Sequence, residues 1–460
     1  MAHLLTSRTS SQATKLVSLV ALLIFLPLLL LAAYQTAVLI SRAVGTPADI
    51  VVDVKAVLEP IKTDFYHAFS QSGNGTNVLA PVVAKVRALG PRIIRIDHIF
   101  DGYGVVSGGS GNLSFDWGRL DEVVESIRST GARPMLVLSY MPPAIAQGGS
   151  VIAPPNNWGD WATVVQKTIE HYSGRAEKNI SGVLYECWNE PELAQFGGWK
   201  LGGDKNYLTL YQNCSLGASR ANNINAFSLG GPATANLNKG WILSTLGAGR
   251  VNFLSWHTYN HNPKQFDEDE RNLVSWLLPY PNAVLIPKFI TEFGPTGDKS
   301  TLYASSYAAA HAAAVIRQLI SGGPTYLFSF QLRDTSSGGN DWGLLTSDGS
   351  PKPRYWVYNF IDSMAGDRLA ATGEGTWVTA LATTKNSIIR VLLVNFDASG
   401  AHTENVPVAF INLDDGRYSY RERFLFGRDV TFTETVTGGK LEKLILMPSQ
   451  TVAMLELKKQ

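Results

Sequence analysis

Short apolar runs alternate with longer amphipathic segments through the middle of the chain. Runs of this kind are typical of strands that are buried on both faces of a parallel sheet. They cover residues 65–69, 92–97, 133–140, 182–188, 226–231, 251–259, 284–293 and 325–330. Segments with helical spacing, several of which end in glycine, lie between them: 78–90, 116–131, 158–174 and 302–323.

Eight strands that alternate with helices predict an α/β fold, a (β/α)8 (TIM) barrel over residues 63–365. A doubly wound sheet is the alternative, but no glycine-rich phosphate loop follows the first strand. Residues 366–460 show closely spaced strand patterns, which predict an all-β sandwich domain. We expect the linker 42–62 to add a strand to that domain.

The N-terminal segment 16–41 is apolar and carries no charge. It is long enough to cross a bilayer, so we predict a transmembrane signal anchor with residues 1–15 in the cytoplasm. The rest of a single-pass, membrane-anchored protein would then lie outside the cytoplasm. A cleaved signal peptide, which would make the protein secreted, is the alternative.

Composition narrows the choice of partner. The formal net charge of +1 gives no electrostatic footprint for nucleic acid. The only two cysteines, Cys187 and Cys214, exclude a disulfide framework, and we interpret them as buried free thiols, with a single bridge as the alternative. No Cys/His cluster has zinc spacing, so we expect no metal. Composition indicates no particular oligomeric state.

Two carboxylates follow predicted barrel strands at their C-terminal ends, where barrel enzymes place their catalytic groups. The fourth strand ends in Asn189 and Glu190, and the seventh ends in Glu292. Taken singly, each glutamate could form a structural ion pair. As a pair facing across a pocket, they suit glycosidic bond cleavage, in which one carboxyl gives a proton and the other is ionised. This chemistry needs no cofactor.

The motifs "WNEP" at 188–191 and "TEFG" at 291–294 resemble the acid/base and nucleophile motifs of glycoside hydrolase clan A. Within that clan the chain is most similar to family 39, which includes β-xylosidases, α-iduronidases and exopolysaccharide glycosidases. Four further segments carry the resemblance: "IIRIDHIF", "MLVLSYMPPAIA", "SWHTYNH" and "DWGLLTSDGSPKPRYWVYNF". The similarity covers about residues 60–362.

The resemblance implies a role for each matching residue. Glu190 would be the general acid/base and Glu292 the nucleophile. Asn189 would hold the 2-hydroxyl of the reacting sugar, Tyr259 would hydrogen-bond Glu292, and Arg95 would lie beside Glu292. Two histidines would line the sugar site: His98 and His257. The clan retains anomeric configuration, which implies carboxyls about 5–5.5 Å apart.

The chain departs from the family where the eighth strand usually ends with tryptophan. Gln331 stands there, and Trp342 would supply the ring instead, or else Gln331 or Arg333 would recognise a polar group on the sugar. An ion pair between Arg333 and Asp334 is the alternative for the arginine. We also predict Trp199 as a sugar platform, because it lies in a glycine-flanked loop after the acid/base.

The sequence therefore predicts a retaining glycoside hydrolase that acts on an extracellular oligo- or polysaccharide, with the membrane as its other partner. A catalytically silent carbohydrate-binding barrel in cell-surface polysaccharide assembly is one alternative. A transglycosylase that uses the same glycosyl-enzyme intermediate is another.

Overall fold

The computed structural model describes residues 45–320 and 325–460 of the 460-residue chain. The predicted cytoplasmic segment 1–15 and the predicted transmembrane anchor 16–41 lie outside these described residues. Within the described ranges, no helix combines the length and the apolar character needed to cross a membrane.

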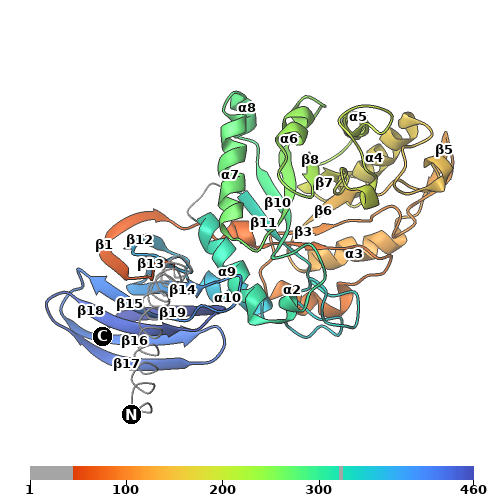
Figure 1. The fold of residues 1–460 in the computed structure, drawn as a ribbon. Helices are drawn as coiled ribbons and strands as arrows, with labels where there is room; N and C mark the ends of the chain where they lie inside the picture. Colours follow the sequence, from red (N-terminus) through yellow and green to blue (C-terminus); the bar gives the residue numbers. More distant parts are fainter. Residues whose placement is uncertain (1–44, 321–324) are drawn as a thin grey trace, which may run out of the picture.

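Eight parallel strands close into a barrel in the order β10-β11-β2-β3-β6-β7-β8-β9 (Figure 1). The strands are β2 (Ala68–Gln71), β3 (Ile93–Ile96), β6 (Arg133–Leu138), β7 (Val183–Cys187), β8 (Phe227–Thr234), β9 (Phe253–Tyr259), β10 (Lys288–Gly294) and β11 (Thr325–Phe330). The predicted (β/α)8 barrel is confirmed. Because the strands are parallel, their carboxyl ends all meet at one rim, which brings Glu190 and Glu292 to the same face.

Helices surround the barrel (Figure 1). They are α2 (Val83–Arg87), α3 (Gly118–Ser129), α4 (Trp158–Ser173), α5 (Tyr207–Arg220), α6 (Lys239–Leu246), α7 (Lys264–Leu277), α8 (Pro281–Val284), α9 (Ser306–Ile320) and α10 (Tyr355–Asp362). Asparagine side chains accept hydrogen bonds from first-turn N–H groups and so begin three helices: Asn157 for α4, Asn206 for α5 and Asn238 for α6.

The short elements lie in the connections. A hairpin of β4 (Val106–Gly109) and β5 (Asn112–Phe115) precedes α3. Single 3₁₀ turns are η1 (Asp64–Tyr66), η2 (Ala80–Val82), η3 (Gln147–Gly149), η4 (Ala194–Phe196) and η5 (Thr301–Ala304). Of these, η4 follows the strand that delivers Glu190, so it lies beside the candidate site.

The C-terminal strands and one N-terminal strand form a nine-stranded sheet in the order β17-β16-β19-β14-β13-β12-β1-β15-β18. Its strands are β1 (Ile50–Pro60), β12 (Asp367–Thr372), β13 (Val378–Lys385), β14 (Ile388–Asn395), β15 (Glu404–Ile411), β16 (Gly416–Phe424), β17 (Asp429–Val436), β18 (Leu441–Met447) and β19 (Thr451–Lys459). β1 pairs antiparallel with β12 and parallel with β15, so the linker region contributes a strand.

The predicted sandwich of two sheets requires a correction, because hydrogen bonds join all nine strands into one sheet. One apolar cluster nevertheless contains residues from both ends of that sheet, including Val406 and Ile445 at one end and Tyr418 and Tyr420 at the other. The sheet therefore curls around a single core. A curled sheet buries one face of each strand as a sandwich does, which explains why the sequence patterns of the two look alike.

The sheet packs against α9 on the side of the barrel (Figure 1). Alanines fill much of this helix, and their small side chains allow β13, β14 and β19 to approach closely. The barrel's apolar core continues into the sheet through Leu392, Val394 and Met454. Arg317 of α9 also donates to the carbonyl of Ala380 at 3.0 Å. The sheet thus supports the barrel.

Cys187 and Cys214 are joined by a disulfide, which corrects the interpretation of two free thiols. Both residues are fully buried. The bridge links the end of β7, three residues before Glu190, to helix α5. The two cysteines are far enough apart in sequence that their contact depends on the packing of α5 on β7, which the sequence pattern does not encode.

We expect the Cys187–Cys214 bridge to stabilise the protein by about 2–4 kcal/mol, because it closes a loop in the unfolded chain. Denaturant unfolding of the oxidised protein should show a lower midpoint after reduction. The Cys187→Ala/Cys214→Ala variant should be insensitive to reductant. Two thiols titrated in the unreduced, unfolded protein, or identical curves with and without reductant, would contradict this expectation.

Candidate active site

Glu190 and Glu292 face each other across the rim of the barrel. Glu190 follows β7, and its backbone N–H donates to the carbonyl of Ala233 at 2.8 Å. Glu292 lies on β10, where the register with β9 shifts just before it. One carboxylate oxygen of each glutamate and one ring nitrogen of His257 all lie within 4.8 Å of one another. Strands of the barrel wall therefore hold two carboxyls close together at a mostly buried position.

Arg95 of β3 lies fully buried beneath this pair. Its guanidinium donates from Nε to Glu186 at 2.6 Å, from Nη1 to Glu292 at 2.8 Å and from Nη2 to Asn189 at 2.6 Å. Glu186 is thus the hydrogen-bonded interior group that its inward position on the strand indicates. Three strands are tied together at the level where the two carboxyls emerge.

Tyr259 and Asn189 are also held in place. The Tyr259 hydroxyl donates to Glu292 Oε2 at 2.8 Å, so both oxygens of that carboxylate accept a hydrogen bond. The side chain of Asn189 accepts from Arg95 and donates to the Tyr140 hydroxyl at 3.0 Å. Tyr140 was not among the predicted site residues. It stands at the end of the third predicted strand, and barrel enzymes place their functional residues at strand ends.

His257 lies between the two carboxyls. Its Nδ1 is 2.9 Å from Glu190 Oε1 and 3.6 Å from Glu292 Oε2. Burial lowers the pKa of His257, but Glu292 and Glu190 outweigh burial and raise it above its usual value. Burial raises the pKa of the Glu292 carboxyl above its usual value, and the charges of His257 and Arg95 offset this only in part. The two carboxyls and the imidazole therefore influence each other's protonation.

A cavity of about 450 Å³ opens above this cluster. Most of the predicted site residues line it, namely His98, Asn189, Glu190, Tyr259, Glu292, Gln331 and Trp342. Arg95 and His257 lie beneath it and reach it only through their partners. Phe196 and Phe330 add aromatic surface to the wall. A cavity with two facing carboxyls and aromatic walls suits a sugar ring.

Gln331 lies at the position where the eighth strand ends. Its Oε1 accepts hydrogen bonds from Gln71 Nε2 at 3.0 Å and from the Ser72 N–H at 3.4 Å. Its own amide nitrogen donates to none of the described residues, so it is available to a ligand. Trp342 also lines the cavity, and its indole N–H donates to the carbonyl of Gly297 at 3.0 Å. The amide of Gln331 and the indole ring of Trp342 therefore both line the cavity.

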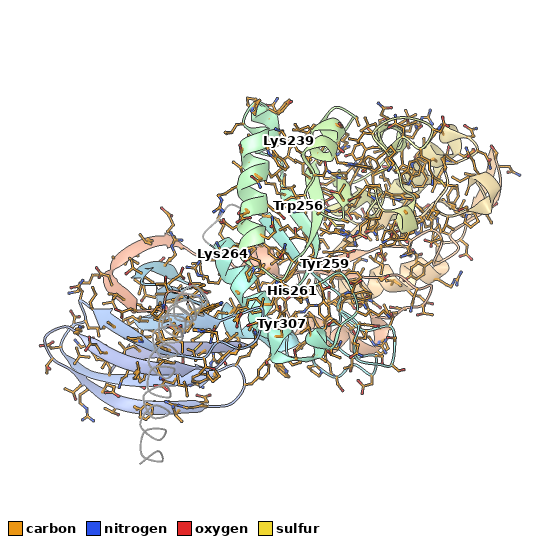
Figure 2. All side chains as sticks on the ribbon, viewed as in Figure 1. Lys239, Trp256, Tyr259, His261, Lys264 and Tyr307 are labelled. Carbon is orange, nitrogen blue, oxygen red and sulfur yellow. A yellow bond between two sulfur atoms is a disulfide. The ribbon has the colours of Figure 1, made fainter. Side chains whose placement is uncertain are left out.

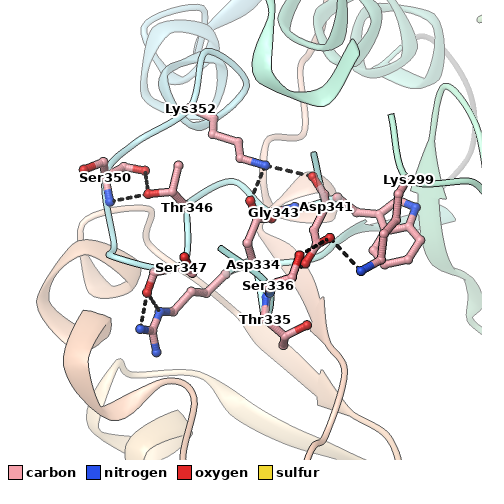
Figure 3. Close-up of polar contacts among 12 residues, drawn as sticks. Lys299, Asp334, Thr335, Ser336, Asp341, Gly343, Thr346, Ser347, Ser350 and Lys352 are labelled. Carbon is pink, nitrogen blue, oxygen red and sulfur yellow. Dashed lines mark hydrogen bonds and ion pairs between the residues drawn. The ribbon is translucent and has the colours of Figure 1, made fainter. Parts of the chain in front are cut away.

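The loop that carries Trp342 is fixed by buried charge (Figure 3). The Lys352 ammonium lies 2.5 Å from Asp334 and donates to the Asp341 carbonyl at 2.8 Å. From the loop after β10, Lys299 pairs with the Asp341 carboxylate at 2.8 Å and lies 5.5 Å from the centre of the Trp342 ring. These contacts hold the tryptophan against the loop that follows β10.

The prediction of Trp199 as a sugar platform is wrong. The residue is fully buried, its ring packs on Trp188 with centroids 5.4 Å apart, and it does not line the cavity. A side chain at Gly197 would collide with the Trp199 ring, so the glycine serves to let the chain cross that ring. Phe196 takes the wall position instead, stacked on Tyr140 with centroids 5.7 Å apart.

His98 projects from the loop after β3, where its backbone is in the left-handed region (φ 52°). Its Nδ1 lies 2.9 Å from Asp101 Oδ2. Burial lowers the pKa of His98, but Asp97 and Asp101 outweigh this and raise it to about 9. His98 is therefore a cationic donor in the cavity wall at neutral pH.

Arg333 does not reach the sugar site, and it does not pair with Asp334. Its guanidinium donates to the backbone carbonyls of Ser347 and Val78. Asp334 pairs with Lys352 instead. Both sequence interpretations of Arg333 thus need correction, because loop carbonyls distant in sequence supply its partners.

Comparison with known proteins supports the resemblance. The family model described as "Glycosyl hydrolases family 39" matches residues 84–410. The β-xylosidase of Caldicellulosiruptor saccharolyticus is 25% identical over 356 residues, covering 68% of this chain and 70% of that protein. The β-xylosidase of Geobacillus stearothermophilus is 24% identical over 303 residues, covering 55% of this chain and 57% of that protein.

Solved structures share the fold. The GH39 enzyme from Xanthomonas axonopodis pv. citri superposes with a TM-score of 0.72 at 17% identity, covering 90% of this chain and 98% of that one. A monomeric β-xylosidase from Caulobacter crescentus CB15 gives a TM-score of 0.71 at 17% identity, covering 90% of this chain and 99% of that one.

We expect Arg95→Met to destabilise the protein by about 3–5 kcal/mol at pH 7, because it leaves two buried carboxylates without their cation. The difference in unfolding free energy between wild type and Arg95→Met should shrink as the pH falls toward 5, since unpaired Glu186 and Glu292 then take up protons. Denaturant unfolding at both pH values measures this. Arg92→Met is the control, because Arg92 pairs with Asp64 at the exposed surface. Equal stability of the Arg95 and Arg92 variants would contradict the role given to Arg95.

Proposed function

Since the chain belongs to glycosyl hydrolase family 39 and is a glycoside hydrolase, we propose that it cleaves its substrate with retention of anomeric configuration. Glu190 is the general acid/base and Glu292 the nucleophile in this proposal. The close approach of the two carboxyls carries it. Retaining enzymes hold the two groups about 5–5.5 Å apart, whereas inverting enzymes need about 6.5–9.5 Å to admit a water.

The hydrogen bonds support the division of roles. Both oxygens of Glu292 accept from donors, Arg95 and Tyr259, which favours the ionised form that a nucleophile needs. Among the described residues, the Glu190 carboxyl has a hydrogen-bond partner only in the His257 ring. Its side chain is also more exposed, at 12% against 7% for Glu292. A carboxyl that must gain and lose a proton in each cycle needs such access to the substrate and to water.

In the first step a Glu292 oxygen attacks the anomeric carbon while the glycosidic C–O bond breaks. Glu190 gives its proton to the departing oxygen, and a glycosyl ester of Glu292 forms. In the second step Glu190 takes a proton from water, the water oxygen attacks the anomeric carbon, and the Glu292 carboxylate is released. Asn189, held by Arg95 and Tyr140, would bond the 2-hydroxyl, a contact that strengthens as charge develops on the sugar.

We propose a neutral saccharide as the substrate. Among the described residues, the cavity lining contains acidic groups, such as Asp97 and Asp298, but no lysine or arginine. A uronic acid would bring its carboxylate against these acids with only His98 as a cation. The β-xylosidases among the relatives make β-xylosides the first compounds to test. The free amide nitrogen of Gln331 favours a sugar with an oxygen substituent at that position.

An extracytoplasmic location, with the protein anchored by residues 16–41, remains part of this proposal. The Cys187–Cys214 bridge supports it, because disulfides persist mainly in oxidising compartments. Protein isolated from its own cells with both thiols reduced would contradict it.

We expect Glu292→Gln and Glu190→Gln to lower kcat on aryl glycosides, the former by about 10³-fold or more, because each removes one half of the chemistry. The Glu190 variant should lose less on substrates whose leaving group needs no proton. Glu192→Gln is the control, since the Glu192 carboxylate accepts from the backbone N–H of Ala235 and does not line the catalytic cavity. Wild-type rates in either catalytic variant would contradict the roles given to Glu190 and Glu292. Faster turnover of aryl uronides than of neutral aryl glycosides would contradict the proposal of a neutral substrate.

Tyr259→Phe should move the acidic limb of the kcat/KM profile to higher pH. The hydroxyl stabilises ionised Glu292, so its loss raises the pKa of that carboxyl, and a shift of one unit corresponds to about 1.4 kcal/mol. Rates across pH 4–8 measure the limb. Tyr303→Phe is the control, because its hydroxyl donates to the Thr296 carbonyl. An unmoved limb would show that Tyr259 does not tune the nucleophile.

A further inference from the structure

A second cleft, of about 330 Å³, lies where the barrel meets the β-sheet. The loop after β9 and helix α9 form one wall, and the residues around β13 and β14 form the other. Figure 2 shows His261, Lys264 and Tyr307 at this junction. This cleft shares no lining residue with the catalytic cavity, and none of the residues of the proposed mechanism lines it.

Trp377 offers an aromatic surface in this cleft. The residue is half-buried and lines the cleft, and the His402 ring covers it at a centroid distance of 4.1 Å. His402 itself is not part of the cleft wall. Trp377 therefore contributes indole surface to the cleft, with the His402 ring packed beside it. Partly exposed indole surface in a cleft suits the apolar C–H face of a sugar ring.

Side chains with free hydrogen-bond donors line the same cleft. The side-chain amide nitrogens of Asn262 and Gln318, both in the cleft wall, donate to none of the described residues. Lys264 has no ion pair within the described part of the chain. Asp397, by contrast, uses its carboxylate to accept from the Ser399, Ala401 and His402 N–H groups. The cleft thus offers free donors and little net charge.

The cleft is separated from the catalytic cavity by one loop. Tyr259, which holds Glu292, lines the catalytic cavity, and His261, two residues later, lines the cleft. Between them, the Asn260 carbonyl accepts from His311 of α9 at 2.7 Å, and His261 Nδ1 contacts the Tyr307 hydroxyl at 2.8 Å. Both contacts hold the loop to α9 and turn it away from the catalytic cavity.

We propose that this cleft is a second saccharide site, in which Trp377 stacks on a neutral sugar unit of the polysaccharide whose other units reach the catalytic cavity. The proposal extends the proposed function and rests on it for the nature of the ligand. Such a site would hold a polymer across the β9 loop. It would leave the hydrolysis of small glycosides unchanged, because these occupy only the catalytic cavity.

Affinity electrophoresis through gels that contain soluble xylan, mannan or mixed-linkage β-glucan tests this. The Glu292→Gln variant of the full chain serves as parent, because it binds without degrading the polymer. We expect at least one polymer to retard the parent. Adding Trp377→Ala should then weaken the apparent affinity about threefold to tenfold, the range expected for one ring contact. Trp377→Phe, which keeps a ring, should restore part of it.

Trp356→Ala in the same parent is the matched control, because Trp356 is 47% exposed on α10 and lines neither cavity. Thermal unfolding checks that each variant is folded. No retardation by any of the polymers, or equal retardation of the parent and the folded Trp377→Ala variant, overturns the proposal. Aryl glycoside hydrolysis by Trp377→Ala with Glu292 intact reports separately on the proposed function, and a loss there would also contradict an independent site.

Discussion

The buried guanidinium of Arg95 is the contact on which the candidate site depends. It binds Glu186 and Asn189 on the β7 side and Glu292 on β10, so one rigid planar group sets the positions of three others. Burying such a charge is costly unless every donor finds a partner. Each of the three guanidinium nitrogens donates one hydrogen bond, because β7 and β10 bring Glu186, Asn189 and Glu292 to the end of β3. The geometry of the two carboxyls is thus a consequence of how the buried charge is compensated.

Around that contact the site separates the environments of its two glutamates. Glu292 lies deeper and is bonded on both oxygens, whereas Glu190 meets the cavity and the His257 ring. Both glutamates raise the pKa of His257, which lies between them, against the opposing effect of burial. Two carboxyls this close together need a cation near them, and the Arg95 guanidinium supplies it from below. In the proposed mechanism Glu190 carries the proton and Glu292 does not, in keeping with the donors that Arg95 and Tyr259 direct at Glu292.

Much of this arrangement could be predicted from the sequence, because strand ends are local features. The apolar runs gave the eight barrel strands, and the polar residues after the fourth and seventh gave Asn189, Glu190 and Glu292. Features that depend on packing between distant segments could not be predicted. Trp199 and Phe196 occupy the same glycine-flanked loop, and only the packing on Trp188 decides which ring is buried. The disulfide, the carbonyl partners of Arg333 and the single curled sheet are further cases of this kind.

In the proposed mechanism Glu292 forms a covalent bond to the sugar. An activated 2-deoxy-2-fluoro glycoside, of whichever sugar the enzyme hydrolyses as an aryl glycoside, slows both steps and traps the intermediate. Intact-protein mass spectrometry followed by peptide mapping then locates the label. We expect one sugar per chain, attached to the peptide that contains Glu292. A label on Glu190 or Glu186, or turnover that inverts the anomeric configuration without any label, would contradict it.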